Sequence, residues 1–477
     1  MTSTTSVQLL GSLIGNPVTR TLLASYSHHC EADGGNRLEV ALEHYLGLRE
    51  DVCLRCRLAE APLASLLSTG GKAFGVTEED LKRTFQDPYW RKGLLSVVKG
   101  ISEFGMKRPF VPGAPFQVVW DVTYACNLRC KHCYASAGEA HQDELTTAEG
   151  VALIDRLAAM GVPIIAFSGG EPLVRPDLLE LAKHAEGKGM FVALATNGTL
   201  LTPEKVAALK ENGVGYLQIS LDGADAAVHD GFRGVPGAFD RTVGGIRNAI
   251  DQDLFVNIST TVTRNNIGEV PQIIDLCGDL GVNWFMAYNF IPAGRGRNMI
   301  EEDLSPEQRE ELLEMLYHRN DGSKMQVLTT APQFARVALQ QSGGPAFVPT
   351  HFFNQKVAGD LMGLTEFVGG CGAGRFYMAI RANGDVDPCV FFHHTVGNVR
   401  RDDLEDLWRH DPFLASLRDK DSLRENCGSC DYRHHCGGCR ARAYSYSGGD
   451  HLAPDPGCVR NAQAYRDIRS MIIKDIR

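Results

Sequence analysis

Strand-like and helix-like segments alternate through the middle of this chain, and the alternation limits the possible folds more than any other feature. Six short apolar segments rich in β-branched residues begin at residues 116, 163, 190, 215, 255 and 283. Helical periodicity occurs between them, at residues 146–159, 177–188, 203–212 and 267–280. Repeated strand–helix–strand units join parallel strands through right-handed crossovers. We therefore predict an α/β fold built on a partial (β/α)6 TIM-like barrel.

Four polar or glycine-rich motifs directly follow the first four predicted strands. They are a cysteine cluster with Cys126, Cys130 and Cys133, the segment SGGEP at 168–172, TNG at 196–198 and SLDG at 220–223. Functional residues of such barrels collect where the strands end. The four motifs should therefore lie on one rim and form one active site.

The cysteine cluster offers three thiolates within eight positions. Structural zinc sites and iron–sulfur clusters usually take four protein ligands. A set of three leaves one metal position for a substrate or a cofactor, which is the pattern of a catalytic site. A structural zinc knuckle is the alternative interpretation.

Composition excludes some classes of function. The chain has 477 residues and a formal charge of -10, which argues against a nucleic-acid binder because phosphate contacts need a basic surface. Its sequence contains no run of about 18 apolar residues that could cross a bilayer. The N-terminus lacks the features of a secretory signal, so we predict a cytoplasmic protein. In that reducing compartment the 14 cysteines are expected to bind metals rather than form disulfides.

The CxxxCxxC cluster after the first strand and the GGEP turn after the second resemble the radical S-adenosylmethionine (SAM) superfamily. The resemblance implies that Cys126, Cys130 and Cys133 hold a [4Fe–4S] cluster whose fourth iron binds SAM. It also implies a reductant such as ferredoxin or flavodoxin, and a 5′-deoxyadenosyl radical that removes hydrogen from an unactivated carbon. The SAM-contacting residues that it implies are Tyr134, Gly169, Gly170, Glu171, Pro172, Asn197, Ser220 and Asp222.

Seven further cysteines in the last quarter of the chain resemble the SPASM domain, the auxiliary cluster module of many radical SAM enzymes. The central block reads CxxCx5CxxC, one residue shorter than the usual CxxCx5CxxxC. The resemblance implies one or two auxiliary [4Fe–4S] clusters. Their ligands would be Cys427, Cys430, Cys436 and Cys458 for the first, and Cys371, Cys389 and Cys439 for the second. Zinc ribbons are the alternative, because CxxC pairs suit zinc equally well.

The cysteines near the N-terminus have two open interpretations. One is a mononuclear iron or zinc site, for which the nearby candidate ligands are Cys30, Cys53, Cys56, His28 and His29. The other is a set of buried free thiols. Cys277 stands alone on the apolar side of a predicted helix, and we predict that it belongs to the core.

Two basic segments have consequences for the substrate. Residues 89–110 form an amphipathic pattern with lysines on one face, which fits either a helix on an anionic membrane surface or a helix packed on its own domain. Arg295 and Arg297 lie among glycines after the sixth predicted strand. They fit a site for a phosphate or carboxylate of the substrate, or else a solvated basic loop.

The layout of the whole chain is similar to that of the archaeal tetraether lipid synthases. We divide it into a mainly helical region at 1–112, a radical SAM barrel at 113–335 and a SPASM-like domain at 336–477. The similarity implies a cytoplasmic enzyme, peripheral to the membrane, that couples sp3 carbons of diether lipid tails. The alternative is a SPASM maturase of peptides or a radical SAM enzyme that decarboxylates haem precursors. An electron carrier is the third class, and the open cluster argues against it.

Overall fold

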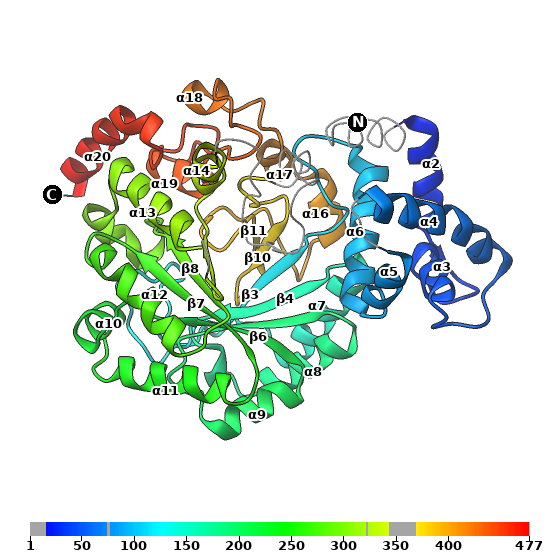
Figure 1. Ribbon diagram of the computed structural model, residues 1–477, viewed down its shortest axis with the longest axis horizontal. Coiled ribbons are helices and arrows are strands. Elements are labelled where there is room, and N and C mark those ends of the chain that lie inside the picture. Colours follow the sequence, from blue (N-terminus) through cyan, green and yellow to red (C-terminus); the bar gives the residue numbers. More distant parts are fainter. Residues whose placement is uncertain (1–15, 74–76, 321–322, 343–368, 477) are drawn as a thin grey trace.

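The computed structural model describes residues 16–73, 77–320, 323–342 and 369–476. In Figure 1 the N-terminal helices lie to the right of the central sheet, and the C-terminal elements lie above it, opposite helices α8, α9 and α11. The boundary that we predicted at residue 336 falls inside helix α14 (Gln333–Gln341). The division into three domains therefore stays a prediction.

The six predicted strands are confirmed, and they form one continuous parallel sheet. They are β3 (Gln117–Thr123), β4 (Ile164–Gly169), β5 (Phe191–Thr196), β6 (Val214–Ser220), β7 (Phe255–Val262) and β8 (Trp284–Asn289). Two further strands, β9 (Gln326–Thr329) and β10 (Tyr377–Ile380), extend it in parallel at the β8 and β3 edges. A hairpin of β11 (Asp385–Asp387) and β12 (Gly397–Asn398) completes the order β12-β11-β10-β3-β4-β5-β6-β7-β8-β9.

Helices cover the outer face of this sheet (Figure 1). They are α7 (Thr147–Met160), α8 (Leu178–Gly187), α9 (Pro203–Glu211), α11 (Ala238–Ile250), α12 (Val270–Asp279) and α13 (Pro306–Arg319). Helix α10 (Ala226–Arg233) and the short 3-10 turns η1 (Pro172–Val174), η2 (Ile267–Glu269) and η3 (Gly294–Glu302) lie in the connections that follow strands β6, β4, β7 and β8. Reciprocal capping boxes fix the starts of α7, through Thr146 and Glu149, and of α13, through Ser305 and Gln308. Cys277 of α12 is fully buried in the main core, as predicted.

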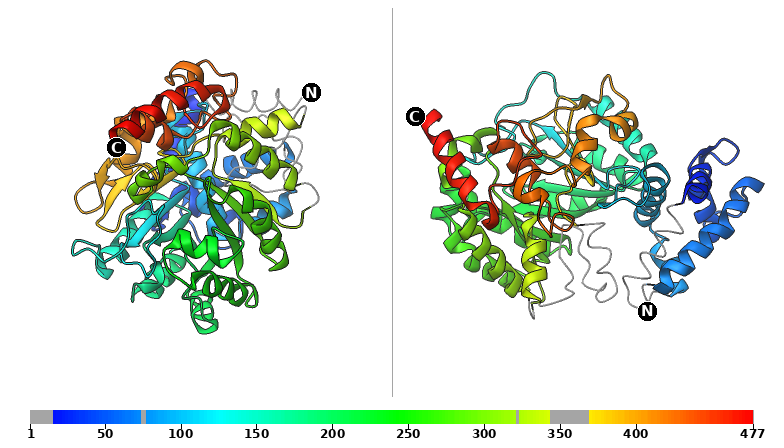
Figure 2. Two further views of the ribbon diagram at one scale, coloured as in Figure 1. Left: turned by 90° about the vertical axis from the view of Figure 1, so that its left-hand side faces the viewer. Right: turned by 90° about the horizontal axis from the view of Figure 1, so that it is seen from above.

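The N-terminal region is mainly helical, as expected, and has a small core of its own. It comprises α2 (Pro17–Tyr26), β1 (His29–Cys30), β2 (Gly35–Asn36), α3 (Arg37–Tyr45), α4 (Leu54–Ala73), α5 (Glu78–Thr84) and α6 (Pro88–Phe104). Leu38, Leu42, Ala59 and Leu63 are buried together in that core. Figure 2 shows that α2, α3 and α4 project to one side of the barrel.

Helix α6 is the basic amphipathic segment, and it packs on its own chain. Ser96 Oγ donates to Ala114 O at 3.0 Å, and Lys99 pairs with Glu405 of the C-terminal region. Its apolar residues Val98 and Ile101 are buried as well. The structure therefore gives no support to the membrane-surface interpretation. Among the described residues, no helix is long and apolar enough to cross a bilayer.

The C-terminal region is rich in loops, and its strands β10, β11 and β12 continue the sheet beyond β3. Its helices are α16 (Leu404–His410), α17 (Pro412–Arg418), α18 (Glu425–Gly428), α19 (Arg440–Tyr446) and α20 (Ala462–Ile476), with the turn η4 (Val459–Asn461). Trp408 of α16 is fully buried, and its Nε1 donates to Pro112 O at 3.0 Å. This contact joins the C-terminal region to the segment that enters β3.

We expect Trp408→Ala to lower the free energy of unfolding by about 3–5 kcal/mol, because the substitution leaves a cavity and an unpaired carbonyl. The shift of the urea-unfolding midpoint measures this loss. Trp90→Ala is the control, since Trp90 is 45% exposed on α6, and it should change the free energy by no more than about 0.5 kcal/mol. Equal shifts in the two variants would contradict the role given to Trp408.

Candidate active site

The three cysteines of the first cluster lie in the loop that follows β3, and the fold brings them together. Cys126, Cys130 and Cys133 share a small apolar cluster with Leu128 and Ala238. Each sulfur also receives a nitrogen donor: Leu128 N lies 3.4 Å from Cys126 Sγ, Ala137 N 3.4 Å from Cys133 Sγ, and Arg233 3.7 Å from Cys130 Sγ. Burial raises the pKa of the Cys126 thiol to about 11. Donors aimed at the sulfurs favour the thiolate form that a metal requires.

The Gly-Gly turn at the end of β4 fits directly against this loop. Gly170 N donates to Thr123 O, and Glu171 N donates to Ala125 O, both at 2.8 Å. A Cβ atom at Gly170 would lie only 2.1 Å from Ala125 O. At Gly169 a Cβ would lie 2.4 Å from Thr123 O, and its φ of +123° also favours glycine. The glycines therefore allow the β4 turn to hold the cysteine loop through the backbone.

Glu171 and Asn197 connect the turn after β4, the end of β5 and the cysteine loop. Glu171 is fully buried; its carboxylate accepts hydrogen bonds from Thr196 Oγ1 at 2.7 Å and from Asn197 N at 2.8 Å. Burial raises the pKa of this carboxyl group, and those hydrogen bonds oppose the rise. Asn197 Nδ2 in turn donates to Asn127 Oδ1 of the cysteine loop at 2.8 Å. Pro172 begins the buried turn η1 that follows Glu171.

Asp222 reaches the cluster through an arginine that the sequence did not single out. The Asp222 carboxylate is fully buried and lies 2.7 Å from Arg233, the residue whose guanidinium also contacts Cys130 Sγ. His229 supports Asp222 from behind, since its Nδ1 accepts a hydrogen bond from Asp222 N at 3.1 Å. His229 and Arg233 both belong to α10, the helix that follows the SLDG motif. No pattern in the sequence singles out Arg233, because its role depends on a contact with Cys130 that the fold creates.

Tyr134 links the cysteine loop to the C-terminal region. Its hydroxyl lies 3.0 Å from Asp121 Oδ1 and 3.1 Å from Ser168 Oγ, and its ring packs on Phe391 with centroids 5.3 Å apart. Arg381 of the C-terminal region pairs with Asp121 at 3.2 Å. Tyr134, which we predicted to contact SAM, therefore also connects the cysteine loop to β3, β4 and the C-terminal region.

The other predicted site residues, Ser220, Arg295 and Arg297, differ in exposure and in their hydrogen bonds. Ser220 ends β6, half-buried, opposite Ser259 of β7. The Arg295 guanidinium donates to Cys130 O at 3.0 Å and to Ala137 O at 2.5 Å, so it holds the cysteine loop. Arg297 is exposed on the same rim.

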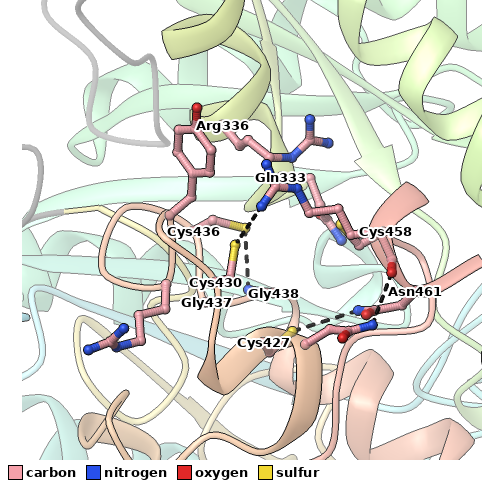
Figure 3. Close-up of a pocket in the computed structure, with 13 residues that line it drawn as sticks. Gln333, Arg336, Cys427, Cys430, Cys436, Gly437, Gly438, Cys458 and Asn461 are labelled. Atoms are coloured by element: carbon pink, nitrogen blue, oxygen red, sulfur yellow. Dashed lines mark hydrogen bonds between the residues drawn. The ribbon is translucent and has the colours of Figure 1, made fainter.

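The C-terminal cysteines separate into the two predicted sets. Cys427, Cys430, Cys436 and Cys458 line one partly open pocket, together with Gln333, Arg336 and Asn461 (Figure 3). Nitrogen donors again face the sulfurs, among them Gly438 N at 3.3 Å from Cys436 Sγ. Figure 3 shows the cysteines pointing into the cavity from several directions.

The remaining C-terminal cysteines form the second set. Burial raises the pKa of Cys389, and the neighbouring Cys371 and Cys439 raise it further. Phe391, which contacts Tyr134, lies two residues after Cys389. This set therefore adjoins the cysteine loop of the barrel.

Residues 120–277 match the model of the radical SAM superfamily, and residues 371–431 match an iron–sulfur cluster-binding domain. The AdoMet-dependent heme synthase of Methanosarcina barkeri is 38% identical over 351 residues, which cover 72% of this chain and 97% of that protein. The pre-heme d1 synthase of Dinoroseobacter shibae is 34% identical, with 72% and 86% covered.

A maturase and a solved structure are also similar. The mycofactocin maturase MftC of Mycobacterium tuberculosis is 34% identical over 355 residues, covering 73% of this chain and 83% of the maturase. Streptococcus suis SuiB, solved with its precursor peptide SuiA, superposes with a TM-score of 0.61 over 84% of this chain and 89% of SuiB. Its sequence identity of 18% means that this likeness concerns the fold alone.

We expect Gly170→Ala to lower the iron content of the protein, because the added methyl group collides with Ala125 O and displaces the cysteine loop. Iron analysis of anaerobically reconstituted protein measures the effect, and the loss should approach the four atoms of one [4Fe–4S] cluster, about four per chain. Gly187→Ala on α8 is the control, since a Cβ there has no atom within 4 Å. Unchanged iron in Gly170→Ala would rule out this role for the turn.

We also expect His229 to make the folded protein sensitive to acid. Burial, and then Arg233, lower its pKa from 6.5 to about 3. The unfolded histidine takes up a proton first, so this contribution to stability is complete above pH 6.5 and is lost as the pH falls toward 3.

In His229→Asn the amide oxygen replaces Nδ1 as acceptor without titrating, so stability should fall less between pH values of about 7.5 and 5.5 than in the wild type. Urea unfolding at the two pH values measures the difference. His410→Asn is the control, because His410 is exposed on α16. The same pH dependence in all three proteins would contradict the assignment.

The matched families agree with the geometry: a rim of motifs holds three cysteines, and a second domain carries two cysteine sets. Because the protein has these two domains, its cofactors are [4Fe–4S] clusters and SAM. The matched regions cover most of the length of the heme synthase and of the pre-heme d1 synthase, at more than 30% identity. The chain is an enzyme that belongs to the radical SAM superfamily, and it carries an iron–sulfur cluster-binding SPASM domain.

Proposed function

We propose that this enzyme decarboxylates a propionate side chain of a tetrapyrrole. The observation that carries the proposal is the 38% identity to an AdoMet-dependent heme synthase, which extends over 97% of that protein. A pre-heme d1 synthase is similar over a comparable share of the chain. These relatives favour the haem-precursor alternative over the coupling of lipid tails, which they do not support.

The proposed reaction converts a propionate side chain into a vinyl group. When bound, SAM and its cluster supply a 5′-deoxyadenosyl radical that takes one hydrogen atom from the CH2 group next to the ring. The propionate then releases CO2 and one electron as the carbon–carbon double bond of a vinyl group forms. The electron needs an acceptor close to the substrate. A [4Fe–4S] cluster held by Cys371, Cys389 and Cys439 would supply this acceptor, because Phe391 joins the loop of these cysteines to Tyr134 beside the first cysteine set.

Carboxylate recognition at the rim is assigned to Arg297. Its guanidinium is exposed, whereas that of Arg295 is bonded to two carbonyl groups of the cysteine loop. Arg297 also lies near His393, whose pKa is lowered by burial of its ring and then by Arg381 and Arg297. His393 Nε2 is 3.1 Å from Tyr134 O. An arginine in this position can pair with a propionate while the reacting carbon faces the cluster loop.

A peptide substrate is the second candidate. The 34% identity to the maturase MftC favours it. The N-terminal region, however, has only a pair of two-residue strands, β1 and β2, within its described part. A leader-binding domain of winged-helix type would contain a three-stranded sheet there.

The test is an anaerobic reaction of the reconstituted full chain with SAM, dithionite and iron-coproporphyrin III, followed by mass spectrometry. We expect a product lighter by one CO2 and two hydrogens for each converted side chain, with one 5′-deoxyadenosine per conversion. Arg297→Gln should raise KM at least about tenfold, since a charge-assisted hydrogen bond contributes roughly 1.5–3 kcal/mol. Arg466→Gln, at an exposed arginine of α20, is the control. Cleavage of SAM without change of the tetrapyrrole would overturn the proposal, and modification of an added precursor peptide would establish the second candidate.

A further inference from the structure

A second group of possible metal ligands lies in the N-terminal region, outside the active site. It comprises Cys30, Asp33, Cys53 and Cys56, whose ligand atoms all lie within 4.8 Å of one another. Cys30 and Cys56 are 5% and 0% exposed. Asp33 was not among the ligands that the sequence suggested. His28 and His29, which were, do not belong to the group: His28 Nδ1 contacts Ala24 O instead, and His29 is exposed.

Two local structures supply these ligands. Cys30 ends β1, and Asp33 lies in the tight turn to β2, where Gly34 N donates to Cys30 O at 2.8 Å and Gly34 has a φ of +67°. Cys53 and Cys56 lie where α4 begins. The sequence thus provides a C-x2-D pair on a hairpin and a C-x2-C pair at a helix start. Pairs with this spacing are typical of zinc sites.

The carboxylate of Asp33 is held in position by the backbone. Cys53 N donates to its two oxygens at 3.0 and 3.3 Å, and Cys30 Sγ lies 3.4 Å from Oδ2. Arg49 donates to Asp33 O at 3.0 Å. Hydrogen bonds of this kind are expected of a ligand whose orientation must be fixed before the metal binds.

The spacing of the sulfurs decides between a single ion and a cluster. Cys30 Sγ and Cys53 Sγ are 3.6 Å apart. Two thiolates on one tetrahedral ion, each about 2.3 Å from it, are separated by roughly 3.8 Å. In a [4Fe–4S] cluster each cysteine binds a different iron, so the sulfurs lie farther apart. We propose that Cys30, Asp33, Cys53 and Cys56 bind one tetrahedral Zn²⁺ or Fe²⁺ ion.

All four ligands of this ion come from the protein, so the site is closed and structural rather than catalytic. The ion joins the β1–β2 hairpin to the start of α4. Val40 of α3 and Val52 pack beside the cysteines. The small core of the region is formed mainly by α3 and α4, on either side of the segment that carries Cys53. The ion therefore stabilises a region whose apolar core is small, which is a common use of structural metals.

Metal counting on the full chain tests the proposal. Zinc and iron are measured by plasma mass spectrometry in protein reconstituted anaerobically under reducing conditions, for the wild type, Cys53→Ala and Cys277→Ala. We expect Cys53→Ala to lose one metal atom per chain, and the element lost identifies the ion. Cys277→Ala is the matched control, since Cys277 is a buried cysteine of α12 outside the group. The loss of four iron atoms, or of none, would overturn the proposal.

Spectroscopy of the bound ion avoids dependence on how well a variant folds. If the ion is zinc, X-ray absorption at the zinc edge should show three sulfurs at about 2.3 Å and one oxygen at about 2.0 Å. If it is iron, Mössbauer spectra should show a mononuclear thiolate-bound ion beside the clusters. Asp33→Cys should keep the ion and change its ligands to four sulfurs, whereas Asp33→Ala should weaken binding. A ligand shell with fewer than three sulfurs in the wild type would contradict the site.

Discussion

The close backbone contact between the end of β4 and the loop after β3 is the constraint on which the rest of the site depends. At Gly170 the two segments approach so closely that a Cβ atom would lie 2.1 Å from the carbonyl oxygen of Ala125. Parallel pairing of β3 and β4 brings the segments together, and the glycine then lets the turn donate to the loop. Glu171 extends the contact to β5 through Asn197. One backbone approach therefore determines where the three cysteines stand relative to the rim.

Buried charges complete the site and connect it to the C-terminal region. Asp222 holds Arg233 against Cys130, and Arg381 of the C-terminal region pairs with Asp121 under Tyr134. Buried ion pairs contribute little net stability, because desolvation offsets much of their attraction, but removing one partner is costly. We therefore infer that these two ion pairs serve to position other side chains. Each pair sets the location of a group that contacts the cysteine loop.

Most of the barrel could be predicted from the sequence, because its six central strands are short apolar segments separated by periodic helices. Strands β9 and β10 have four residues each, too few to show a period, and β10 pairs with β3 across a separation of about 260 residues. The roles of Arg233 and Asp33 could not be predicted from the sequence either. Each depends on a contact that the fold creates, and a single charged residue carries no periodicity that would reveal it.

The two arginines after β8 have similar sequence surroundings but different environments in the structure. Arg295 and Arg297 are equivalent in the sequence, since both stand between a glycine and a small or polar residue. In the structure the first satisfies carbonyl groups of Cys130 and Ala137, and the second faces solvent beside His393. The cysteine motifs specify radical chemistry because iron and SAM impose a fixed geometry on their ligands. In the proposed function, substrate choice rests on a single exposed rim residue, Arg297, which the sequence does not distinguish from Arg295.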